Sequence, residues 1–231
     1  MLIYGKNALF EALKAHTKIK EIFLRDGVTI LNNVNIDKIK VTVLKKNDFE
    51  LKFPDKNQGV VADIDFKTYD FYDVVEELKD EKCVAVLDHI QDPHNYGAII
   101  RAGHCFGVKF FIVAKDNQCK ITPTVFKTSA GSLIYSKVVE VVNIAKTLDE
   151  IKKMDFYVYA ADVHTERYIS SVSSDGKKAV VIGSEGNGIR PNVLKRADII
   201  FKIPMVSNID SLNASQSAAI AFYELCGKWH G

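Results

Sequence analysis

The sequence predicts an α/β protein built on a parallel sheet. Short continuous apolar runs such as Cys83–Leu87 (C-V-A-V-L) and Lys178–Ile182 (K-A-V-V-I) have the length and composition of buried strands. They alternate with segments whose apolar residues recur at helical spacing, the last of which is Ala214–Cys226. Continuous apolar strands interleaved with helices are typical of a parallel sheet covered on both faces. Ligands of such sheets bind at the carboxyl ends of the strands, so the residues after each strand are the first candidates for function.

Residues 1–70 are predicted to form a small α/β domain. Apolar residues at helical spacing predict a helix over Ala8–Ala15. Three strands are expected, at Glu21–Leu24, Val41–Leu44 and Gly59–Ile64. The acidic stretch that follows contains a short predicted helix around Tyr72–Leu78. We therefore take residues 71–82 as a linker to a second domain, residues 83–231.

The second domain is predicted to alternate strands and helices to its end. The strands are expected at Cys83–Leu87, Lys109–Val113, Lys137–Val142, Phe156–Ala160, Lys178–Ile182 and Ile199–Ile203. The helices are expected at Tyr96–Phe106, Pro123–Ala130, Lys146–Lys153, Asn192–Arg196 and Ala214–Cys226.

Composition excludes several classes of protein and leaves the function open. The 231 residues are 47% apolar and 26% charged, which excludes a disordered tail, a collagen-like repeat and a disulfide mini-protein. The formal net charge of +2 does not indicate a nucleic-acid binder. The charge is uneven, however: residues 1–66 carry 11 basic and 9 acidic side chains, residues 67–82 carry 3 and 6, and residues 83–231 carry 17 and 14. Acidic residues between the two predicted domains therefore mask a modest positive charge on each.

The four cysteines predict a reducing compartment. Cys83, Cys105, Cys119 and Cys226 form no C-x-x-C pair, so neither a zinc ribbon nor any other metal site is expected. Their apolar neighbours predict buried, reduced thiols, as in the cytoplasm. The sequence has no apolar run of 18 residues, and its first residues lack the pattern of a signal peptide. We expect a soluble cytoplasmic protein without a membrane partner.

The first candidate motif follows the strand Cys83–Leu87 and reads D-H-I-Q-D-P-H-N-Y-G-A-I-I-R-A-G. Gly97 permits a close backbone approach, and Asn95 is a candidate N-cap of the next helix. Arg101 interrupts a small apolar helix, where an unpaired buried charge would be costly. On spacing alone, a functional arginine and an arginine in a salt bridge at the helix edge are equally good interpretations.

The second motif, G-S-E-G-N-G at Gly183–Gly188, follows the strand Lys178–Ile182. Three glycines in six residues form a loop whose amides can line a nucleotide or cofactor, or else a plain tight turn. The order of the glycines matches neither the dinucleotide fingerprint nor a P-loop. Because Glu185 would repel a phosphate, the loop suits an adenosine or amino-acid moiety better than a pyrophosphate.

The third motif follows the strand Ile199–Ile203 and reads I-P-M-V-S-N-I-D-S-L-N-A-S-Q-S-A-A. Either Asn213 or Ser211 is a natural N-cap of the last helix. The small residues of this helix allow close packing of another backbone or of a partner helix.

The order and spacing of the three motifs closely resemble those of the SpoU (TrmH) family of RNA ribose methyltransferases in the SPOUT superfamily. The resemblance covers residues 82–228 and is closest to the RlmB-type branch of 23S rRNA guanosine-2′-O-methyltransferases. A weaker match, in I-Y-G-K-N-A-L-F-E-A-L and N-Q-G-V-V-A, makes residues 1–70 resemble the RNA substrate-binding domain of that branch.

The resemblance implies a C-terminal trefoil knot, S-adenosylmethionine as cofactor, a homodimer, and methyl transfer to a ribose 2′-hydroxyl, with a guanosine in 23S rRNA as the favoured substrate. By position, it implies that Gly183, Ile203 and Leu212 bind the cofactor. Ile203 and Leu212 would hold the adenine between apolar side chains.

The resemblance also assigns roles around the reacting hydroxyl. It implies that Arg101 activates the hydroxyl. Because a guanidinium normally stays protonated, the alternative is that Arg101 orients the ribose and stabilises the developing alkoxide. Asn95 would position Arg101 or the ribose, and Glu185 would hold the substrate or the neighbouring motif. Ser211 and Asn213 would support the active site.

The chain departs from the family pattern at Gly103, the last residue of the first motif, and at the next residue, His104. His104 follows the motif and is expected to have no catalytic role. Three other functions stay open: a tRNA 2′-O-methyltransferase of the same family, a non-catalytic RNA-binding protein, and an unrelated nucleotide-binding α/β enzyme.

Overall fold

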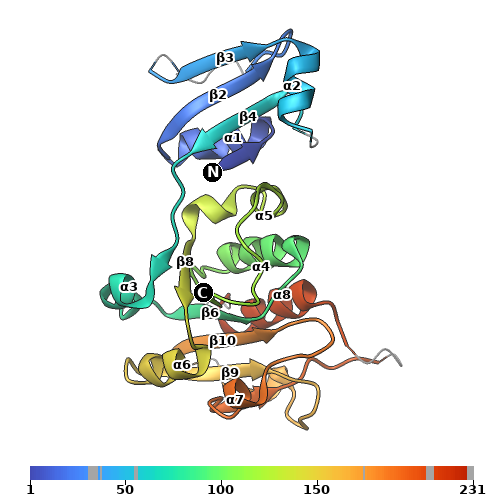
Figure 1. Cartoon of the computed structure of the whole chain (residues 1–231). Coiled ribbons are helices and arrows are strands. Elements are labelled where there is room, and N and C mark those ends of the chain that lie inside the picture. Colours follow the sequence, from blue (N-terminus) through green and yellow to red (C-terminus); the bar gives the residue numbers. More distant parts are fainter. Residues whose placement is uncertain (31–35, 37, 55–56, 174, 207–210, 228–231) are drawn as a thin grey trace.

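The computed structural model describes residues 1–231 except 31–35, 37, 55–56, 174, 207–210 and 228–231. The described strands form two sheets, one above the other in Figure 1. The smaller sheet has the order β1-β4-β2-β3, and the larger has the order β11-β9-β10-β6-β7-β8-β5. We call the parts built on them the N-terminal unit (residues 2–64) and the C-terminal unit (residues 69–227).

The N-terminal unit is a mixed sheet with a helix on each face. Its elements are β1 (Leu2–Tyr4), α1 (Lys6–Lys14), β2 (Ile19–Arg25), β3 (Lys40–Leu44), α2 (Lys46–Lys52) and β4 (Val60–Ile64). Strands β2 and β3 are parallel, whereas β4 is antiparallel to both β1 and β2. Phe49 of α2 packs with Phe23 and Val61 on one face of the sheet. On the other face, Leu9 and Ala12 of α1 join a larger core.

The C-terminal unit is the predicted parallel sheet. Its elements are β5 (Tyr69–Asp70), α3 (Phe71–Leu78), β6 (Cys83–Asp88), α4 (Pro93–Cys105), β7 (Phe110–Ala114), α5 (Pro123–Thr128), a 3₁₀ turn (Ser132–Tyr135), β8 (Lys137–Val141), α6 (Ile144–Lys152), β9 (Phe156–Ala161), a second 3₁₀ turn (Ile169–Ser171), β10 (Lys177–Gly183), α7 (Pro191–Leu194), β11 (Ile199–Phe201) and α8 (Ala214–Leu225). Every pairing between its described strands is parallel. The α/β class with a parallel sheet is therefore confirmed.

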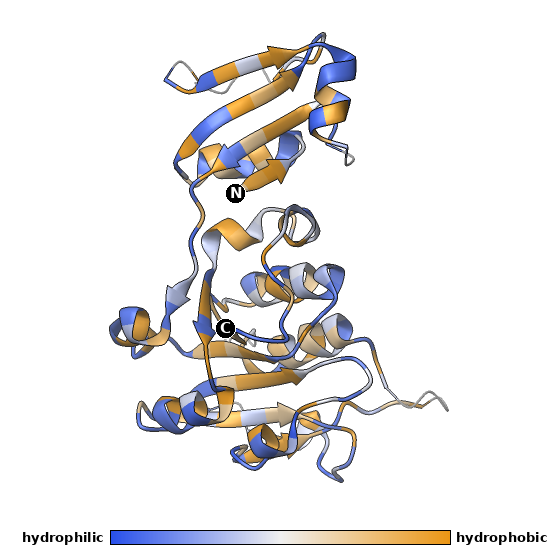
Figure 2. Cartoon of the chain, viewed as in Figure 1, coloured by the Kyte–Doolittle hydropathy of each residue, from blue (hydrophilic) through white to orange (hydrophobic). Residues whose placement is uncertain are grey.

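Helices cover both faces of the larger sheet, as its continuous apolar strands require. Figure 2 shows these strands as largely hydrophobic ribbons. On one face α4, α5 and α8 close a core that contains Ile99, Phe126 and Phe222. On the other, α3, α6 and α7 close a second core that contains Leu78 and Leu148.

Several predicted boundaries differ from the structure. The sequence showed no sign of β1, α2 or β5, which are short or contain few apolar residues. The predicted strand Ile199–Ile203 ends at Phe201, and Lys202 forms only an isolated bridge with Tyr168. The short helix predicted around Tyr72–Leu78 is α3, but it packs against one face of the larger sheet and is not a free linker. Residues 65–68 are the stretch that connects the two sheets.

The cysteines also differ from expectation. Cys83 at the start of β6 and Cys226 at the end of α8 form a disulfide across 143 residues of sequence. Cys105 is exposed and Cys119 is partly buried. The prediction of four buried, reduced thiols is therefore wrong, because sequence neighbours do not show which cysteines the fold brings together. No helix among the described residues has the length and hydropathy to cross a membrane.

Candidate active site

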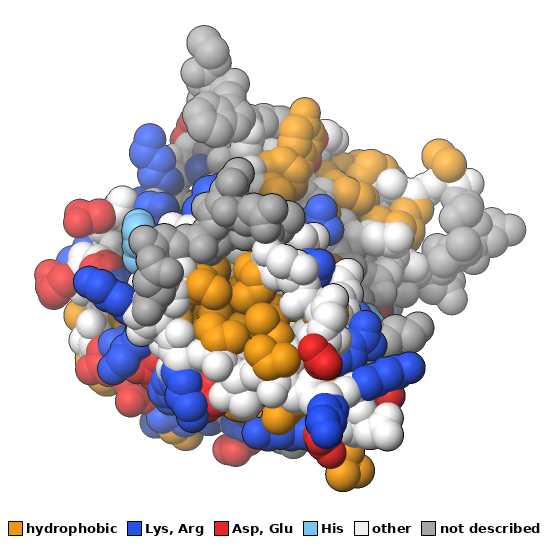
Figure 3. Space-filling model, turned by 90° about the horizontal axis from the view of Figure 1, so that it is seen from above, with side chains coloured by type: hydrophobic (Ala, Val, Ile, Leu, Met, Phe, Trp, Pro, Cys, Tyr) orange, Lys and Arg blue, Asp and Glu red, His pale blue; other side chains and the backbone are white. Residues whose placement is uncertain are grey.

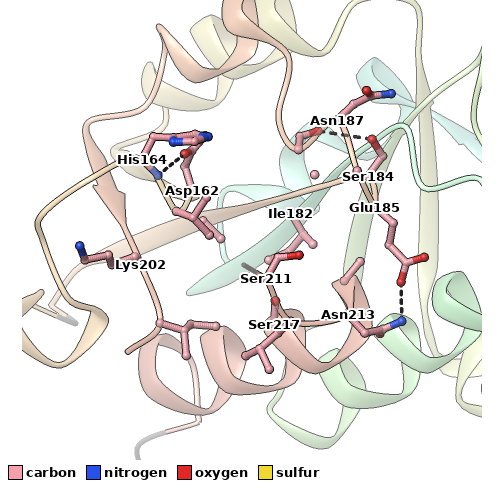
Figure 4. A pocket seen from close by; sticks show the side chains of 18 of the residues that line it. Asp162, His164, Ile182, Ser184, Glu185, Asn187, Lys202, Ser211, Asn213 and Ser217 are labelled. Carbon is pink, nitrogen blue, oxygen red and sulfur yellow. Dashed lines mark hydrogen bonds between the residues drawn. The ribbon is translucent and has the colours of Figure 1, made fainter. Parts of the chain in front are cut away.

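The larger sheet carries a cavity of about 370 Å³ at the carboxyl ends of β9, β10 and β11. Four short segments supply most of its lining: residues 161–164, 182–188, 201–203 and 211–214. Figure 4 shows that these segments surround a common space, with α8 on one side. The cavity lies where ligands of a parallel α/β sheet bind, and it contains Gly183, Ile203 and Leu212, the residues expected to hold the cofactor.

The glycine loop after β10 is folded tightly back on itself. Ser184 and Gly188 exchange two backbone hydrogen bonds, of 3.1 and 3.0 Å, so that the loop closes as a narrow turn. A Cβ at Gly183 would lie 2.3 to 2.5 Å from backbone atoms of Gly188 and Ile189. Position 183 therefore accepts only glycine, and the turn presents Glu185 at its tip. The loop is both a tight turn and a wall of the cavity, so the two interpretations of this motif are compatible.

Asn213 brings the three motifs together. Its Nδ2 donates hydrogen bonds to Asn95 Oδ1, at 2.9 Å, and to Glu185 Oε1. Its Oδ1 accepts from the backbone nitrogen of Ser215 at 2.8 Å and from the Ser215 hydroxyl at 2.6 Å, which caps α8. Figure 4 shows Asn213 and Glu185 pointing toward each other at one end of the cavity. One side chain from each motif therefore meets at the cavity edge.

The cap of α4 is Asp92 rather than Asn95, which corrects the sequence interpretation. The Asp92 carboxylate accepts from the backbone nitrogens of His94 and Asn95, each at 3.2 Å. Because Asp92 performs the capping, the Asn95 side chain is available to Asn213. Asn95 is buried, with 7% of its surface exposed. Burial of the neighbouring Tyr96 raises the pKa of its phenol above the ordinary value.

Gly97 behaves as predicted, since it lets another segment approach α4. A Cβ there would lie 1.9 Å from Thr128 Oγ1 and 2.6 Å from the Val125 carbonyl oxygen of α5. This contact fixes the first turn of α4, and with it the position of Asn95.

Arg101 lies apart from this cluster. Its side chain is exposed on α4, so Arg101 does not need the partner that a buried arginine would require. The described residues that line the cavity include Ser211 but not Arg101. The structure thus brings together Asn95, Glu185 and Asn213, and leaves Arg101 at the surface of the single chain.

Sequence inspection showed no sign of an ion pair at the base of the glycine loop, between the buried Asp88 and the partly exposed Arg190. Asp88, the last residue of β6, is fully buried and pairs in register with Gly183. Its carboxylate accepts from the Arg190 backbone nitrogen at 2.8 Å and from Arg190 Nε at 2.9 Å. His89 Nδ1 lies 2.8 Å from the same carboxylate. Asp88 therefore holds the loop at both its start and its exit.

The opposite end of the cavity carries a second polar group. His164 donates its backbone N–H to the Asp162 carboxylate at 2.7 Å, and Lys202 Nζ lies 3.2 Å from the Glu166 carboxylate. Figure 4 places Asp162, His164 and Lys202 together, across the cavity from Asn213. The cavity thus offers polar contacts at both ends and the side chain of Ile182 between them, which suits an elongated ligand with two polar ends.

Two family models match the chain. "SpoU rRNA Methylase family" covers residues 82–223, and "RNA 2′-O ribose methyltransferase substrate binding" covers residues 2–70. A protein of Staphylococcus aureus (strain COL), named "Putative TrmH family tRNA/rRNA methyltransferase", is 34% identical over 241 residues, which span 99% of this chain and 96% of that protein.

Solved structures share the fold. The SpoU methyltransferase AviRb from Streptomyces viridochromogenes, in complex with the cofactor AdoMet, superimposes with a TM-score of 0.83 at 19% identity, covering 98% of this chain and 89% of that one. An AdoMet-bound rRNA methyltransferase from Sinorhizobium meliloti superimposes with a TM-score of 0.80 at 18% identity, covering 97% and 85%. Because the first family model spans more than half of the chain and the Staphylococcus relative matches nearly all of it, this chain belongs to the SpoU (TrmH-type) methyltransferase family.

Proposed function

We propose that this protein transfers a methyl group from S-adenosylmethionine to a ribose 2′-hydroxyl of RNA. The observation that carries the proposal is the Asn95–Asn213–Glu185 cluster at the edge of the cavity, because it joins one residue from each of the three motifs. The family models support the reaction class, and the AdoMet complexes of the two solved relatives support the cofactor.

The cavity fits this cofactor. Its volume of about 370 Å³ lies within the range of about 300–1,000 Å³ that small-molecule sites occupy. Ile203 and Leu212 supply apolar surface for the adenine, and Gly183 lets the loop that forms one wall fold closely back on itself. When bound, the cofactor supplies an electrophilic methyl group on a sulfonium.

The chain's own residues then have to orient the hydroxyl and manage its proton. Asn213 fixes Asn95 and Glu185 relative to each other, so that polar groups are already placed where the ribose would enter. Arg101 contributes either as the group that accepts the proton or as a cation that orients the ribose and stabilises the developing alkoxide. Ser211, which also lines the cavity, supports this arrangement.

A homodimer would complete the site. Arg101 is exposed and outside the described cavity lining, so a second copy can bring its own Arg101 to the Asn213 cluster. The small residues of α8 (A-S-Q-S-A-A) suit close packing at such an interface. We also propose that the segment after β10 is threaded as a trefoil knot, which is supported by the match of residues 82–223 to the SpoU family model.

The substrate is proposed to be a guanosine of 23S rRNA, as in the RlmB-type branch, with residues 1–70 as the RNA-binding domain and residues 83–231 as the catalytic domain, against which α3 of the predicted linker packs. The match of residues 2–70 to the substrate-binding model supports this division. On the face seen in Figure 3, Lys and Arg side chains lie at several places around an apolar area, an arrangement compatible with RNA. Binding should weaken with salt. We expect the enzyme in the cytoplasm.

Transfer of a tritiated methyl group tests the proposal. Purified protein is incubated with tritiated S-adenosylmethionine and separate rRNA and tRNA fractions, and the labelled nucleoside is mapped. Label on a ribose of 23S rRNA supports the proposal in full. Label confined to tRNA supports the family's alternative substrate, whereas label on a base contradicts the proposed reaction.

A further inference from the structure

His104, which departs from the family pattern at the end of α4, stacks on an aromatic ring. Its imidazole lies 5.4 Å from the ring of Tyr135, centroid to centroid, with 21° between the planes. His104 is three residues after Arg101, and residues at that spacing lie on the same face of a helix. The Tyr135 ring therefore supports the turn of α4 that carries Arg101.

Tyr135 also reaches across to the N-terminal unit. Its hydroxyl donates a hydrogen bond to Glu11 Oε2 of α1 at 2.9 Å, across 124 residues of sequence. Gly131, just before the 3₁₀ turn of Tyr135, leaves room for this contact. A Cβ at Gly131 would lie 2.8 Å from Glu11 Cγ, and the backbone φ of +87° also favours glycine. Glu11, which belongs to the N-terminal unit, therefore lies against the backbone of the C-terminal unit.

Apolar packing also joins the two units. Leu9 and Ala12 of α1 belong to the same hydrophobic core as Phe126 and Leu133 of the C-terminal unit. Burial of apolar surface is strong and non-directional, so it holds two parts together without fixing their angle. A hydrogen bond and a stacked pair of rings depend on direction. These two contacts can therefore fix the angle between the units.

We propose that Glu11, Tyr135 and His104 form an orientation link, which holds the RNA-binding unit at a fixed angle to the helix that carries Arg101. These three are positioning residues. The link rests on the proposed function, since it sets the position of the RNA-binding N-terminal unit relative to Arg101, the residue proposed to act on the ribose.

The first test needs neither RNA nor cofactor. Backbone hydrogen exchange is measured over α1 and residues 131–135 in the wild type and in the Tyr135→Phe and Glu11→Ala variants of the full chain. We expect faster exchange in both segments. The control is Tyr157→Phe, which removes a hydroxyl from an exposed tyrosine on β9. Exchange unchanged from the wild type in both test variants would overturn the link.

The second test separates the hydroxyl from the ring. Loss of one hydrogen bond to a carboxylate in Tyr135→Phe should raise KM for RNA by about three- to tenfold and leave kcat unchanged. Tyr135→Leu, which also removes the stack on His104, should lower kcat as well. Glu11→Gln retains an acceptor and should keep most of the wild-type KM.

The double variant Tyr135→Phe/Glu11→Ala should behave like either single variant, because both remove the same interaction. The orientation link would be contradicted if the effects of the two substitutions on KM for RNA were additive. It would also be contradicted if the variants lost affinity for the cofactor as much as for RNA. If the wild type methylates no RNA, the proposed function fails, while the exchange experiment still decides whether the link exists.

Discussion

Asn213 Nδ2 lies 2.9 Å from Asn95 Oδ1, and this hydrogen bond joins the start of α8 to the start of α4 across 118 residues of sequence. The same amide group donates to Glu185 and caps its own helix. In the proposed mechanism both stability and catalysis therefore depend on the Asn213 side chain, so a test of its catalytic role needs a control for lost stability.

Asn213→Ala should abolish most turnover and also destabilise the protein. Loss of an N-cap costs about 1 kcal/mol, and Asn95 and Glu185 lose the group that holds them in place. Methyl transfer and thermal unfolding are measured together. The matched control is Asn143→Ala, because Asn143 caps α6 through Lys146 N at 3.1 Å, far along the chain from the three motifs. It should lose similar stability and keep its turnover. If both variants lost activity equally, Asn213 would be only a cap.

Arg190→Ala should loosen the glycine loop. It leaves the fully buried Asp88 carboxylate without its guanidinium, which should cost about 2–3 kcal/mol of unfolding free energy. The Kd of S-adenosylmethionine should rise, since the loop that carries Glu185 loses its anchor.

Urea unfolding and calorimetric titration measure the two effects. Arg196→Ala is the control, because Arg196 pairs with Asp149 at 3.6 Å on the surface, where such a pair contributes about 0–1 kcal/mol. If both substitutions lowered the free energy of unfolding equally, the burial of Asp88 would not increase the contribution of its ion pair to stability.

Gly183→Ala should prevent cofactor binding while the protein stays folded. The added methyl group would lie 2.3 to 2.5 Å from backbone atoms across the loop, so the loop has to open. Gly186→Ala tests the alternative that any alanine in the loop impairs cofactor binding. A Cβ at position 186 would have nothing within 4 Å, so the only cost there is the unfavourable φ of +83°. Calorimetric titration should show loss of S-adenosylmethionine binding for the first variant and a smaller effect for the second. The reverse order would contradict the close contact.

Arg101→Ala should lose turnover and retain most of its affinity for the cofactor, because Arg101 lies outside the described cavity lining. Mixing this variant with Asn213→Ala tests the dimer directly. If Arg101 of one copy acts at the Asn213 of the other, mixed dimers contain one intact site and recover part of the activity. A mixture that stays inactive after subunit exchange would place both residues of a site in the same chain.

The sequence predicted the larger sheet well because its strands are buried on both faces. Lys178–Ile182 is predicted as a strand and lies within β10, since a continuous apolar run leaves few other structures. Helix α2 was missed because K-N-D-F-E-L-K shows too few apolar residues for a helical period. The cap of α4 was assigned to Asn95 because the D-P-H-N segment offers two candidates. Pro93 at the first helical position favours Asp92.

The residues of the candidate site could be found by motif, but their contacts could not. Arg190 was overlooked because its partner Asp88 is 102 residues away, and nothing local marks an arginine as paired. Tyr135 and Glu11 are likewise far apart in sequence, and each is unremarkable in its own segment. Spacing shows which face of a helix a residue occupies, whereas pairing between distant segments depends on the packing of the whole chain.

The cap of α8 makes the assembled site observable without any substrate. The Ser215 amide proton is held by Asn213 Oδ1 at 2.8 Å, and the same side-chain amide holds Asn95 and Glu185. Fraying of the first turn of α8 is therefore expected to accompany disruption of the cluster. A single resonance, that of Ser215 N–H, would then report the fraction of molecules in which the Asn95–Asn213–Glu185 cluster is assembled.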